Sequence, residues 1–208
     1  MTELDAINRM LAVIGEAPVD SLSSIQINEI TDSALARRTL AEVNRDVQAE
    51  GWSWNTDEPV ELGATAQDEF VLPPDTLSAQ FSPTQYSDCQ YVQRGLKVYD
   101  RQKQTYAFAD DVGGQLYVSR LIRQLDWDQL PHQAQEYISI RAARIYSDRF
   151  TNSTVIFSYT SGDETYARSM LIRSEESSLN NNLLWGNDRG VGQGLGYLPA
   201  VGTRYRTR

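Results

Sequence analysis

The chain has 208 residues, a mass of 23.5 kDa and a formal net charge of −9, which suits one domain or one domain with an insertion. A single cysteine, Cys89, and a single histidine, His132, exclude an intrachain disulfide and metal sites built from several cysteines or histidines. No apolar run approaches the ~18–20 residues that cross a bilayer, and the acidic start MTELDAINRM lacks the basic region of a secretory signal, so we expect a protein made in the cytosol or built into a particle there.

The first predicted element is a helix over residues 2–14. Thr2 suits its N-cap, and acidic residues in the first turn favour the helix dipole. Gly15 suits its left-handed end, and Pro18 prevents its continuation. Three- and four-residue spacings place one apolar stripe on it, made of Leu4, Ile7, Leu11 and Ile14.

A second helix is predicted over residues 32–49. Thr31 or Asp32 can cap it, and Gly51 follows its end. Its apolar positions again recur at helical spacing, at Ala36, Leu40, Val43 and Val47.

The pattern changes to short extended segments after Trp52, and residues 52–124 are predicted to form a small antiparallel β region. A hairpin is expected at Gly95, between residues 91–94 and 96–100. Trp52 and Trp54 are expected to attach this region to the helices. Further extended segments are expected at Asp68–Leu72, Thr105–Phe108 and Gln115–Ile122, with a turn at residues 110–114.

Helical periodicity returns near Leu125, with Asp126 or Asp128 as a cap and Pro131 in the first turn. The stripe of this third helix is Tyr137, Ile138, Ala142, Ile145 and Tyr146, and it extends to about Phe150. Residues 151–162 are ambiguous, because Thr154–Tyr159 has a β-like composition between helical segments. A fourth helix is predicted over residues 163–179.

The predicted fold class is α+β: a helical bundle framework of about four helices with an inserted small antiparallel β region and a flexible C-terminal arm. Residues 1–51 form the first half of the helical framework and residues 52–124 the inserted β region. Residues 125–180 form the second half of the framework, and residues 181–208 the arm.

The C-terminal arm differs in composition from the rest of the chain. Residues 186–208 contain four arginines and one acid, so they carry +3 and the other 185 residues carry −12. Six of the 13 glycines also lie there, and such a segment cannot build its own core. We expect either a plain disordered tail or an arm that folds onto a partner. The candidate partner-binding residues are Trp185, Tyr197, Leu198, Arg204, Tyr205 and Arg206.

No pattern in the sequence predicts a catalytic, metal or cofactor site. The glycines of GVGQGLG at residues 190–196 do not match the spacing of a nucleotide-binding loop. His132 suits a surface or capping role, and Cys89 has no predictable base beside it. Four acidic pairs remain as candidates for a glycan hydrolase, namely Asp57/Glu58, Asp110/Asp111, Asp126/Asp128 and Glu175/Glu176, and each is also explained by chance in an acidic chain. Four Trp and 11 Tyr instead favour a subunit of an assembly.

The opening LDAINRMLAVIGEAPVDSL resembles the N-terminus of the tail tubular protein A family, the adaptors of short-tailed bacteriophages (podoviruses). The matching positions are Ala6, Asn8, Leu11, Ile14, Gly15, Glu16, Pro18 and Val19, then Ala36, Arg37, Arg38 and Gly51–Asn55. Further similar segments follow in the same order, namely YVQRGLKVYDR (91–101), LIRQLDWDQLP (121–131) and YISIRAARIYSDRF (137–150). The glycine-rich arm departs from the family pattern.

The resemblance implies a structural virion protein, not an enzyme, without cofactors. It implies a ring, expected to be twelvefold, at the head–tail junction between the portal protein and the tail nozzle (tail tubular protein B type), with tail fibres attached nearby and DNA passing through the bore. An acidic subunit fits this role, because the bore must not bind phosphate. Two alternatives stay open: a tail-associated cell-wall hydrolase using the acidic pairs, and a nucleic-acid-binding module acting through the arm.

Overall fold

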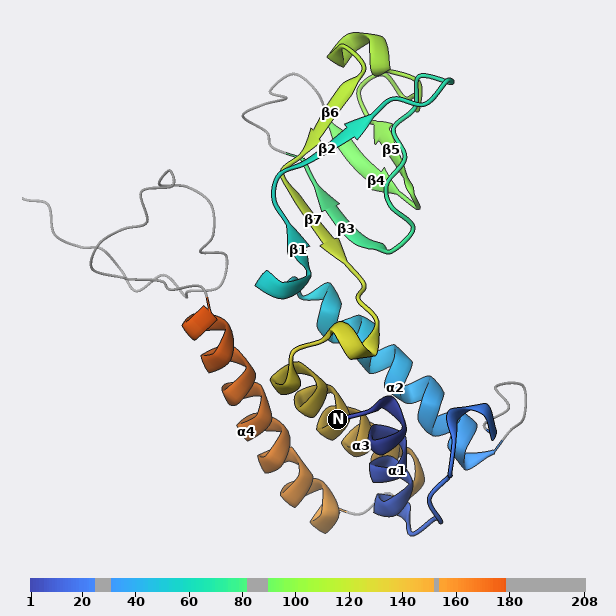
Figure 1. Cartoon of the computed structure of the whole chain (residues 1–208), viewed down its shortest axis with the longest axis vertical. Coiled ribbons are helices and arrows are strands. Elements are labelled where there is room, and N and C mark those ends of the chain that lie inside the picture. The colour runs from blue at the N-terminus through green and yellow to red at the C-terminus, as the bar shows by residue number, and fades with distance from the viewer. Residues whose placement is uncertain (25–30, 82–89, 152–153, 179–208) are drawn as a thin grey trace, which may run out of the picture.

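The computed structural model describes residues 1–24, 31–81, 90–151 and 154–178. The helices gather at one end of an elongated molecule and the strands at the other, and α2 (Asp32–Ala49) leads from the helices towards the strands (Figure 1). Two long helices come first, the strands follow, and two further long helices end the described part. The chain is therefore an α+β protein whose strands lie between two pairs of helices, as predicted.

The first helix, α1, spans Glu3–Ile14 and is capped by Thr2. The backbone N–H of Asp5 donates to the Thr2 hydroxyl at 3.1 Å, and the backbone N–H of Thr2 donates to the Asp5 carboxylate at 2.8 Å. This capping box satisfies amide donors at the helix start. Gly15 ends the helix with a left-handed φ of 81°. The predicted start and end of this helix are confirmed.

The second helix, α2, begins after Thr31, whose hydroxyl accepts a hydrogen bond from the backbone N–H of Ala34 at 3.3 Å. The predicted stripe faces the core, since Ala36, Leu40, Val43 and Val47 are all buried. The loop after α1 is held by Asn8, whose amide group donates to the carbonyl of Val19 at 3.0 Å and accepts from its N–H at 2.8 Å.

Seven strands in the described residues form three antiparallel sheets. The first sheet joins β1 (Thr56–Asp57), β7 (Arg120–Arg123) and β3 (Thr76–Gln80), in that order. The second sheet pairs β2 (Val60–Gly63) with β6 (Gln115–Val118). The third sheet pairs β4 (Tyr91–Arg94) with β5 (Lys97–Asp100). They enclose a separate core that includes Phe70, Leu116 and Val118. The predicted antiparallel β region and its hairpin at Gly95 are confirmed.

Several strand positions were predicted wrongly. Asp68–Leu72 and Thr105–Phe108 contribute isolated bridges and no strand. Gln115–Ile122 breaks at Ser119 into β6 and β7, which belong to different sheets. The strands β1, β2 and β3 were not predicted at all. The ladders of β1, β2 and β3 join segments that lie far apart in the sequence, so local composition does not reveal where their pairing starts and stops.

The third helix, α3, spans His132–Thr151 and begins later than the predicted start near Leu125. Leu130 has φ −74° and ψ 141°, because the ring of Pro131 disfavours the helical conformation in the residue before it. A 3₁₀ turn at Trp127–Gln129, with Asp126 at its N-cap position, occupies the interval. The predicted stripe of α3 is buried at Tyr137, Ile138, Ala142 and Tyr146 and half-buried at Ile145.

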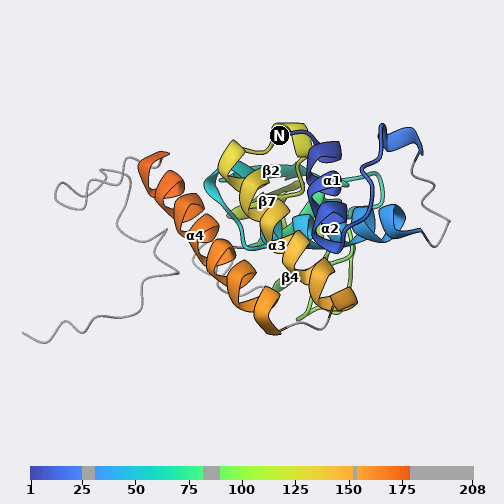
Figure 2. The same cartoon turned by 90° about the horizontal axis from the view of Figure 1, so that it is seen from below.

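The fourth helix, α4, spans Thr154–Ser178 and packs beside α3 (Figures 1 and 2). The segment Thr154–Tyr159, which its composition left ambiguous, forms the first turns of this helix. A β-branched residue lowers the stability of a helix by only about 0.5 kcal/mol, and the packing of a long helix outweighs this loss. The predicted fourth helix is confirmed, but it begins at Thr154 and not at residue 163. Among the described residues, no helix is both long and apolar enough to cross a membrane.

The helices and the sheets meet at the turn that follows α2. Trp52 is 8% exposed within the helical core, and its indole N–H donates to the carbonyl of Val47 at 2.8 Å. Trp54 packs against the same core and stacks on Trp52 with ring centroids 6.4 Å apart. The two tryptophans therefore attach the start of the β region to the helices, as expected.

Candidate interaction surface on the outer face of α4

The residues that the sequence indicates for partner binding lie outside the described part of the structure. These are Trp185, Tyr197, Leu198, Arg204, Tyr205 and Arg206, all within residues 179–208. Cys89 lies outside it too, within residues 82–89. The role of the arm therefore stays a prediction.

The first acidic pair considered for glycan hydrolysis is held by arginines of β7. Asp57 pairs with Arg123 at 3.4 Å, and Glu58 pairs with Arg120 at 3.2 Å. These ion pairs join the start of the β region to the strand that leads back to the helices. They give this acidic pair a structural role.

The other acidic pairs also have structural positions. Asp126 occupies the N-cap position of a 3₁₀ turn, where its backbone N–H donates to the side-chain carbonyl of Gln129 at 3.1 Å. Asp128, inside that turn, is exposed. Asp111 pairs with Lys103 at 2.5 Å, and Glu175 accepts a hydrogen bond from the backbone N–H of Ser53 at 2.5 Å. Within the described ranges, no three His, Cys, Asp or Glu side chains are placed to hold a metal ion.

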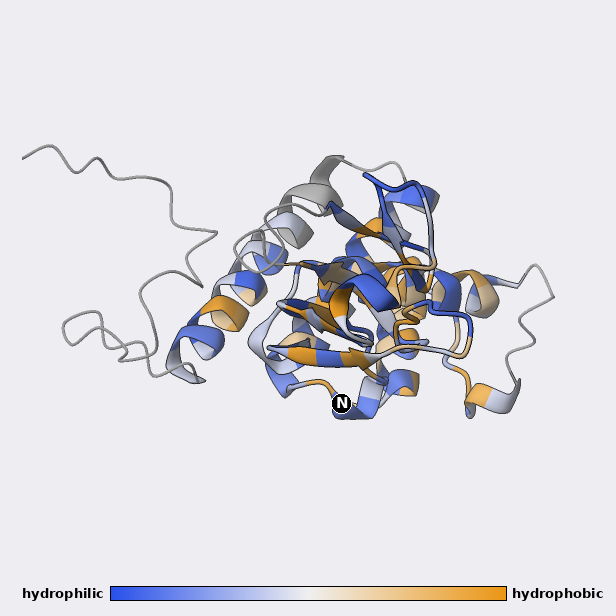
Figure 3. Cartoon of the chain, turned by 90° about the horizontal axis from the view of Figure 1, so that it is seen from above, coloured by the Kyte–Doolittle hydropathy of each residue, from blue (hydrophilic) through white to orange (hydrophobic). Residues whose placement is uncertain are grey.

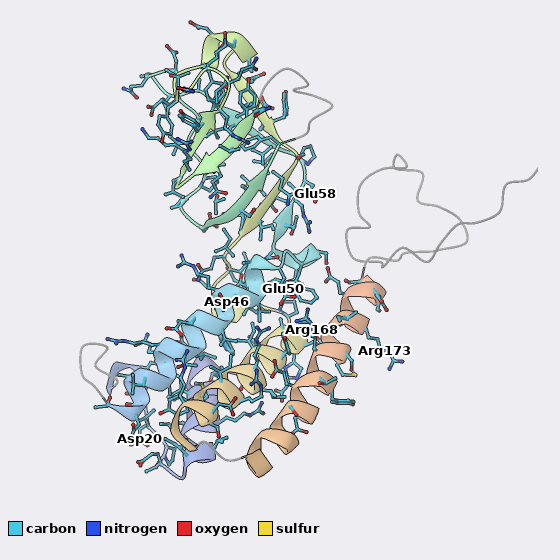
Figure 4. All side chains as sticks on the ribbon, turned by 180° about the vertical axis from the view of Figure 1, so that it is seen from behind. Asp20, Asp46, Glu50, Glu58, Arg168 and Arg173 are labelled. Atoms are coloured by element: carbon cyan, nitrogen blue, oxygen red, sulfur yellow. The ribbon has the colours of Figure 1, made fainter. Side chains whose placement is uncertain are left out.

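The inner face of α4 is fixed to the bundle by apolar and ionic contacts. Ala167 and Leu171, 6% and 1% exposed, belong to the helical core. Arg168 donates two hydrogen bonds to the carboxylate of Glu50, at 3.2 and 2.9 Å, and one to the hydroxyl of Tyr137, at 2.9 Å (Figure 4). The bonds to Glu50 and Tyr137 raise the pKa of Arg168 above its usual value. The inner face of α4 therefore makes its contacts with other residues of the same subunit.

A second ionic cluster continues the contact between α3 and α4. Arg144 donates to Glu164 on α4 and to Asp148 on its own helix, the latter at 3.0 Å. Arg141 donates to the hydroxyl of Tyr137 at 2.8 Å. Together with Arg168 these residues form a polar border beside the apolar contact and fix the rotation of α4 about its axis. The side of α4 that does not contact α3 is therefore held outward.

That outer face carries large apolar side chains that are exposed to solvent. Tyr166 is 68% exposed, Met170 37% and Ile172 40%. In Figure 3 the hydropathy colouring shows an apolar turn among hydrophilic ones on this helix. Ser169, Arg173 and Glu176 complete the lining of a shallow hollow over the same turns. A helix that is apolar on two faces is expected to contact something on each of them.

This surface was not predicted from the sequence, although the signal is present there. Ala167 and Leu171 repeat at four residues, and Tyr166 and Met170 repeat at four residues one position earlier. Two such pairs on one helix indicate two apolar faces, because neighbouring residues are separated by about 100° around the axis. The packing of the helix was needed to decide which pair is buried.

The described residues expose few other large hydrophobic side chains. Val71 and Leu96, 43% and 41% exposed, lie together in the β region, where the backbone N–H of Leu72 donates to the carbonyl of Leu96 at 2.8 Å. In the helical part the remaining one is Val13, near the end of α1 and 36% exposed. The outer face of α4 is thus the largest group of exposed apolar side chains in this part of the chain.

Two comparisons with known proteins identify the family of the chain. A family model described as "Tail tubular protein" matches residues 4–180, which include all of the described sheets and nearly all of the four long helices. "Tail tubular protein A" of Klebsiella phage KP34 is 30% identical over 175 residues, which cover 83% of this chain and 86% of that protein. The resemblance noted in the sequence is confirmed: the chain belongs to the tail tubular protein family, and it is a structural component of a phage tail and not an enzyme.

Proposed function

We propose that the chain is a head-to-tail adaptor that assembles as a ring, expected to be twelvefold, at the head–tail junction of a virion. The ring contacts the portal protein on one side and the tail nozzle on the other, and tail fibres attach nearby. DNA passes through its bore without sequence-specific binding. The observation that carries the proposal is the family match across the helical and β parts of the chain, together with the outward apolar face of α4.

The charge of the chain supports a subunit that lines a path for DNA. Its net charge is −9, and its 19 basic residues are outnumbered by 28 acidic ones. Many of the arginines in the described residues are held in ion pairs, among them Arg120, Arg123 and Arg168. A surface of this kind repels the phosphate backbone, so DNA can slide past it.

Each part of the chain has a role in this proposal. The helical framework, residues 1–51 and 125–180, forms the wall of the ring. The inserted region, residues 52–124, contacts neighbouring subunits and the nozzle. The arm, residues 181–208, carries +3 within residues 186–208 and reaches an adjoining protein, the portal, through Trp185, Tyr197, Leu198, Arg204, Tyr205 and Arg206.

Light scattering tests the proposal directly. The mass of the purified chain is measured alone and then with the cognate portal protein. We expect a ring that binds the portal, or a monomer that joins it in a fixed stoichiometric complex. A chain that stays monomeric and ignores the portal contradicts the adaptor role.

A further inference from the structure

We propose that the outer face of α4 in one subunit packs against the exposed end of α1 in the next subunit, so that copies of the chain join head to tail. On the outer face of α4 the contact uses Tyr166, Met170 and Arg173. On the other side it uses Val13 near the end of α1, together with Glu16 and Asp20 in the loop that follows. This inference rests on the proposed ring and names the surfaces that build it.

A ring requires two different complementary surfaces on each subunit. An interface that uses the same patch on both copies closes as a dimer, whereas a ring repeats a contact between unlike patches. The two patches must therefore lie on different sides of the subunit. Seen from below, α4 and α1 lie on opposite sides of α3 (Figure 2). Both helices pack on α3, so each leaves its outer face available.

The apolar part of the contact follows from exposure. Tyr166, Met170 and Ile172 are exposed on α4, and in the helical part of the described residues Val13 is the one large hydrophobic exposed elsewhere. Interface centres are enriched in tyrosine and methionine, which suits α4 as the anchoring side. The residues that follow Val13 include Gly15, Ala17 and Pro18, whose small or compact side chains leave room for the ring of Tyr166.

The charged part of the contact is complementary. Arg173 lies one turn beyond Met170 and points away from the bundle in Figure 4. Glu16 lies one turn beyond Val13, and Asp20 follows in the same loop. All three are exposed, and within the described part of the chain none of them belongs to an ion pair. The α4 side thus offers an apolar patch with the cation Arg173 next to Met170 and with Glu176 one turn further on. The other side offers an apolar residue with two carboxylates.

Cysteine cross-linking tests which surfaces meet. In a Cys89→Ser background, Val13→Cys and Tyr166→Cys are prepared as separate variants, mixed, and treated with a short bis-maleimide. We expect linked dimers in the mixture and little linkage in either variant alone. Joined in one chain, the two cysteines should give a ladder of linked copies. Val71→Cys mixed with Tyr166→Cys is the matched control, since Val71 is also exposed but lies in the β region.

A charge exchange gives an independent readout. Arg173→Glu and Glu16→Arg should each weaken association about tenfold or more, because like charges then meet in the contact. A chain carrying both changes should recover association, because the pair is restored with its signs exchanged. Circular dichroism should show that the two single variants and the double variant all stay folded. Neither Arg173 nor Glu16 has an ion-pair partner among the described residues of its own subunit.

The outcomes separate this inference from the proposed ring. If the unchanged chain forms no closed oligomer, alone or on the portal, the ring and this contact are both wrong. If the unchanged chain forms rings while the mixed cysteines link no better than the control and the double charge exchange restores nothing, the ring stands and the assignment of its surfaces is wrong. Selective linkage with charge rescue supports both.

Discussion

Arg168 on α4 and Glu50 at the end of α2 form a two-bond ion pair, with nitrogen–oxygen distances of 3.2 and 2.9 Å. Glu50 directly precedes Gly51, where the chain leaves the helices for the β region. The pair therefore fixes the last helix to the junction between the two parts of the molecule (Figure 4). Its position explains how α4 keeps a fixed orientation although, in the described part of the chain, its main helix contact is with α3.

Replacing Arg168 with methionine is predicted to destabilise the fold modestly. The side chains of Arg168 and Glu50 are 43% and 31% exposed, so solvent screens the pair and the expected loss is about 1 kcal/mol. Methionine keeps the apolar stem of the side chain. Urea unfolding followed by circular dichroism measures the change. Arg173→Met is the matched control on the same helix and should leave the midpoint unchanged; equal effects of both changes would contradict the role of the pair.

Local patterns sufficed for the first two helices because their start and end signals lie within a few residues. Thr2, Gly15 and Thr31 occupy the positions that their chemistry predicts. The strands were located less well, since β7 pairs with β1 and β3 from distant parts of the chain. The outer face of α4 was missed for a related reason: the pairs 166/170 and 167/171 have the same spacing, and only the position of α3 decides which one is buried.

Gly51→Ala is predicted to destabilise the junction strongly. Gly51 has a φ of 78°, and an added Cβ would lie 2.6 Å from Cδ1 of Ile122. The change combines backbone strain with a steric clash, so we expect a loss of about 2–4 kcal/mol. Gly15→Ala is the control with a similar φ of 81° and no atom within 4 Å of its Cβ, and it should cost only about 1 kcal/mol. Thermal unfolding of both variants measures the difference, and equal losses would contradict the clash.

Asn55→Ala is predicted to be among the most damaging single changes at the same junction. Asn55 is 3% exposed, donates to the carbonyls of Gln48 and Arg123 at 2.8 and 2.9 Å, and accepts from the backbone N–H of Trp52 at 2.8 Å. Its loss leaves buried polar groups without partners, which costs about 2–4 kcal/mol. Chemical denaturation measures the loss, with Asn44→Ala on α2 as a milder control. A loss below about 1 kcal/mol would show that the junction does not depend on Asn55.

Tyr146 is predicted to make stability fall at high pH. Its side chain is fully buried, and its hydroxyl donates to the carbonyl of Asp32 at 2.8 Å. Burial is the largest cause that raises the pKa of Tyr146 from 10.0 to about 12, and the negative charges of Asp32 and Glu16 add to it. The folded chain thus keeps this proton to a higher pH than the unfolded chain. The stabilisation is complete below pH 10 and is lost as the pH rises towards 12.

The size of this pH effect is about 1–3 kcal/mol, because one pKa unit corresponds to about 1.4 kcal/mol. Urea unfolding of the wild-type chain and of Tyr146→Phe, each followed from pH 8 to 11.5, isolates it. The phenylalanine variant should be less stable at pH 8, where it lacks the hydrogen bond, and should show a shallower decline above pH 10. Parallel declines in the two proteins would show that other groups dominate.

Arg204→Glu combined with Arg206→Glu is predicted to weaken docking to the portal while leaving the fold intact. The two changes lower the charge of residues 186–208 from +3 to −1, so an attraction to an acidic partner surface becomes a repulsion. Pull-down with the cognate portal at two salt concentrations measures the effect, and the loss should be largest at low salt. Arg204→Lys with Arg206→Lys keeps the charge and serves as the control.

Deleting residues 186–208 distinguishes the remaining alternative: if the intact chain binds DNA at low salt and the shortened chain does not, the arm contacts nucleic acid. Unchanged portal docking of the glutamate variant would remove the arm from the adaptor's binding surface.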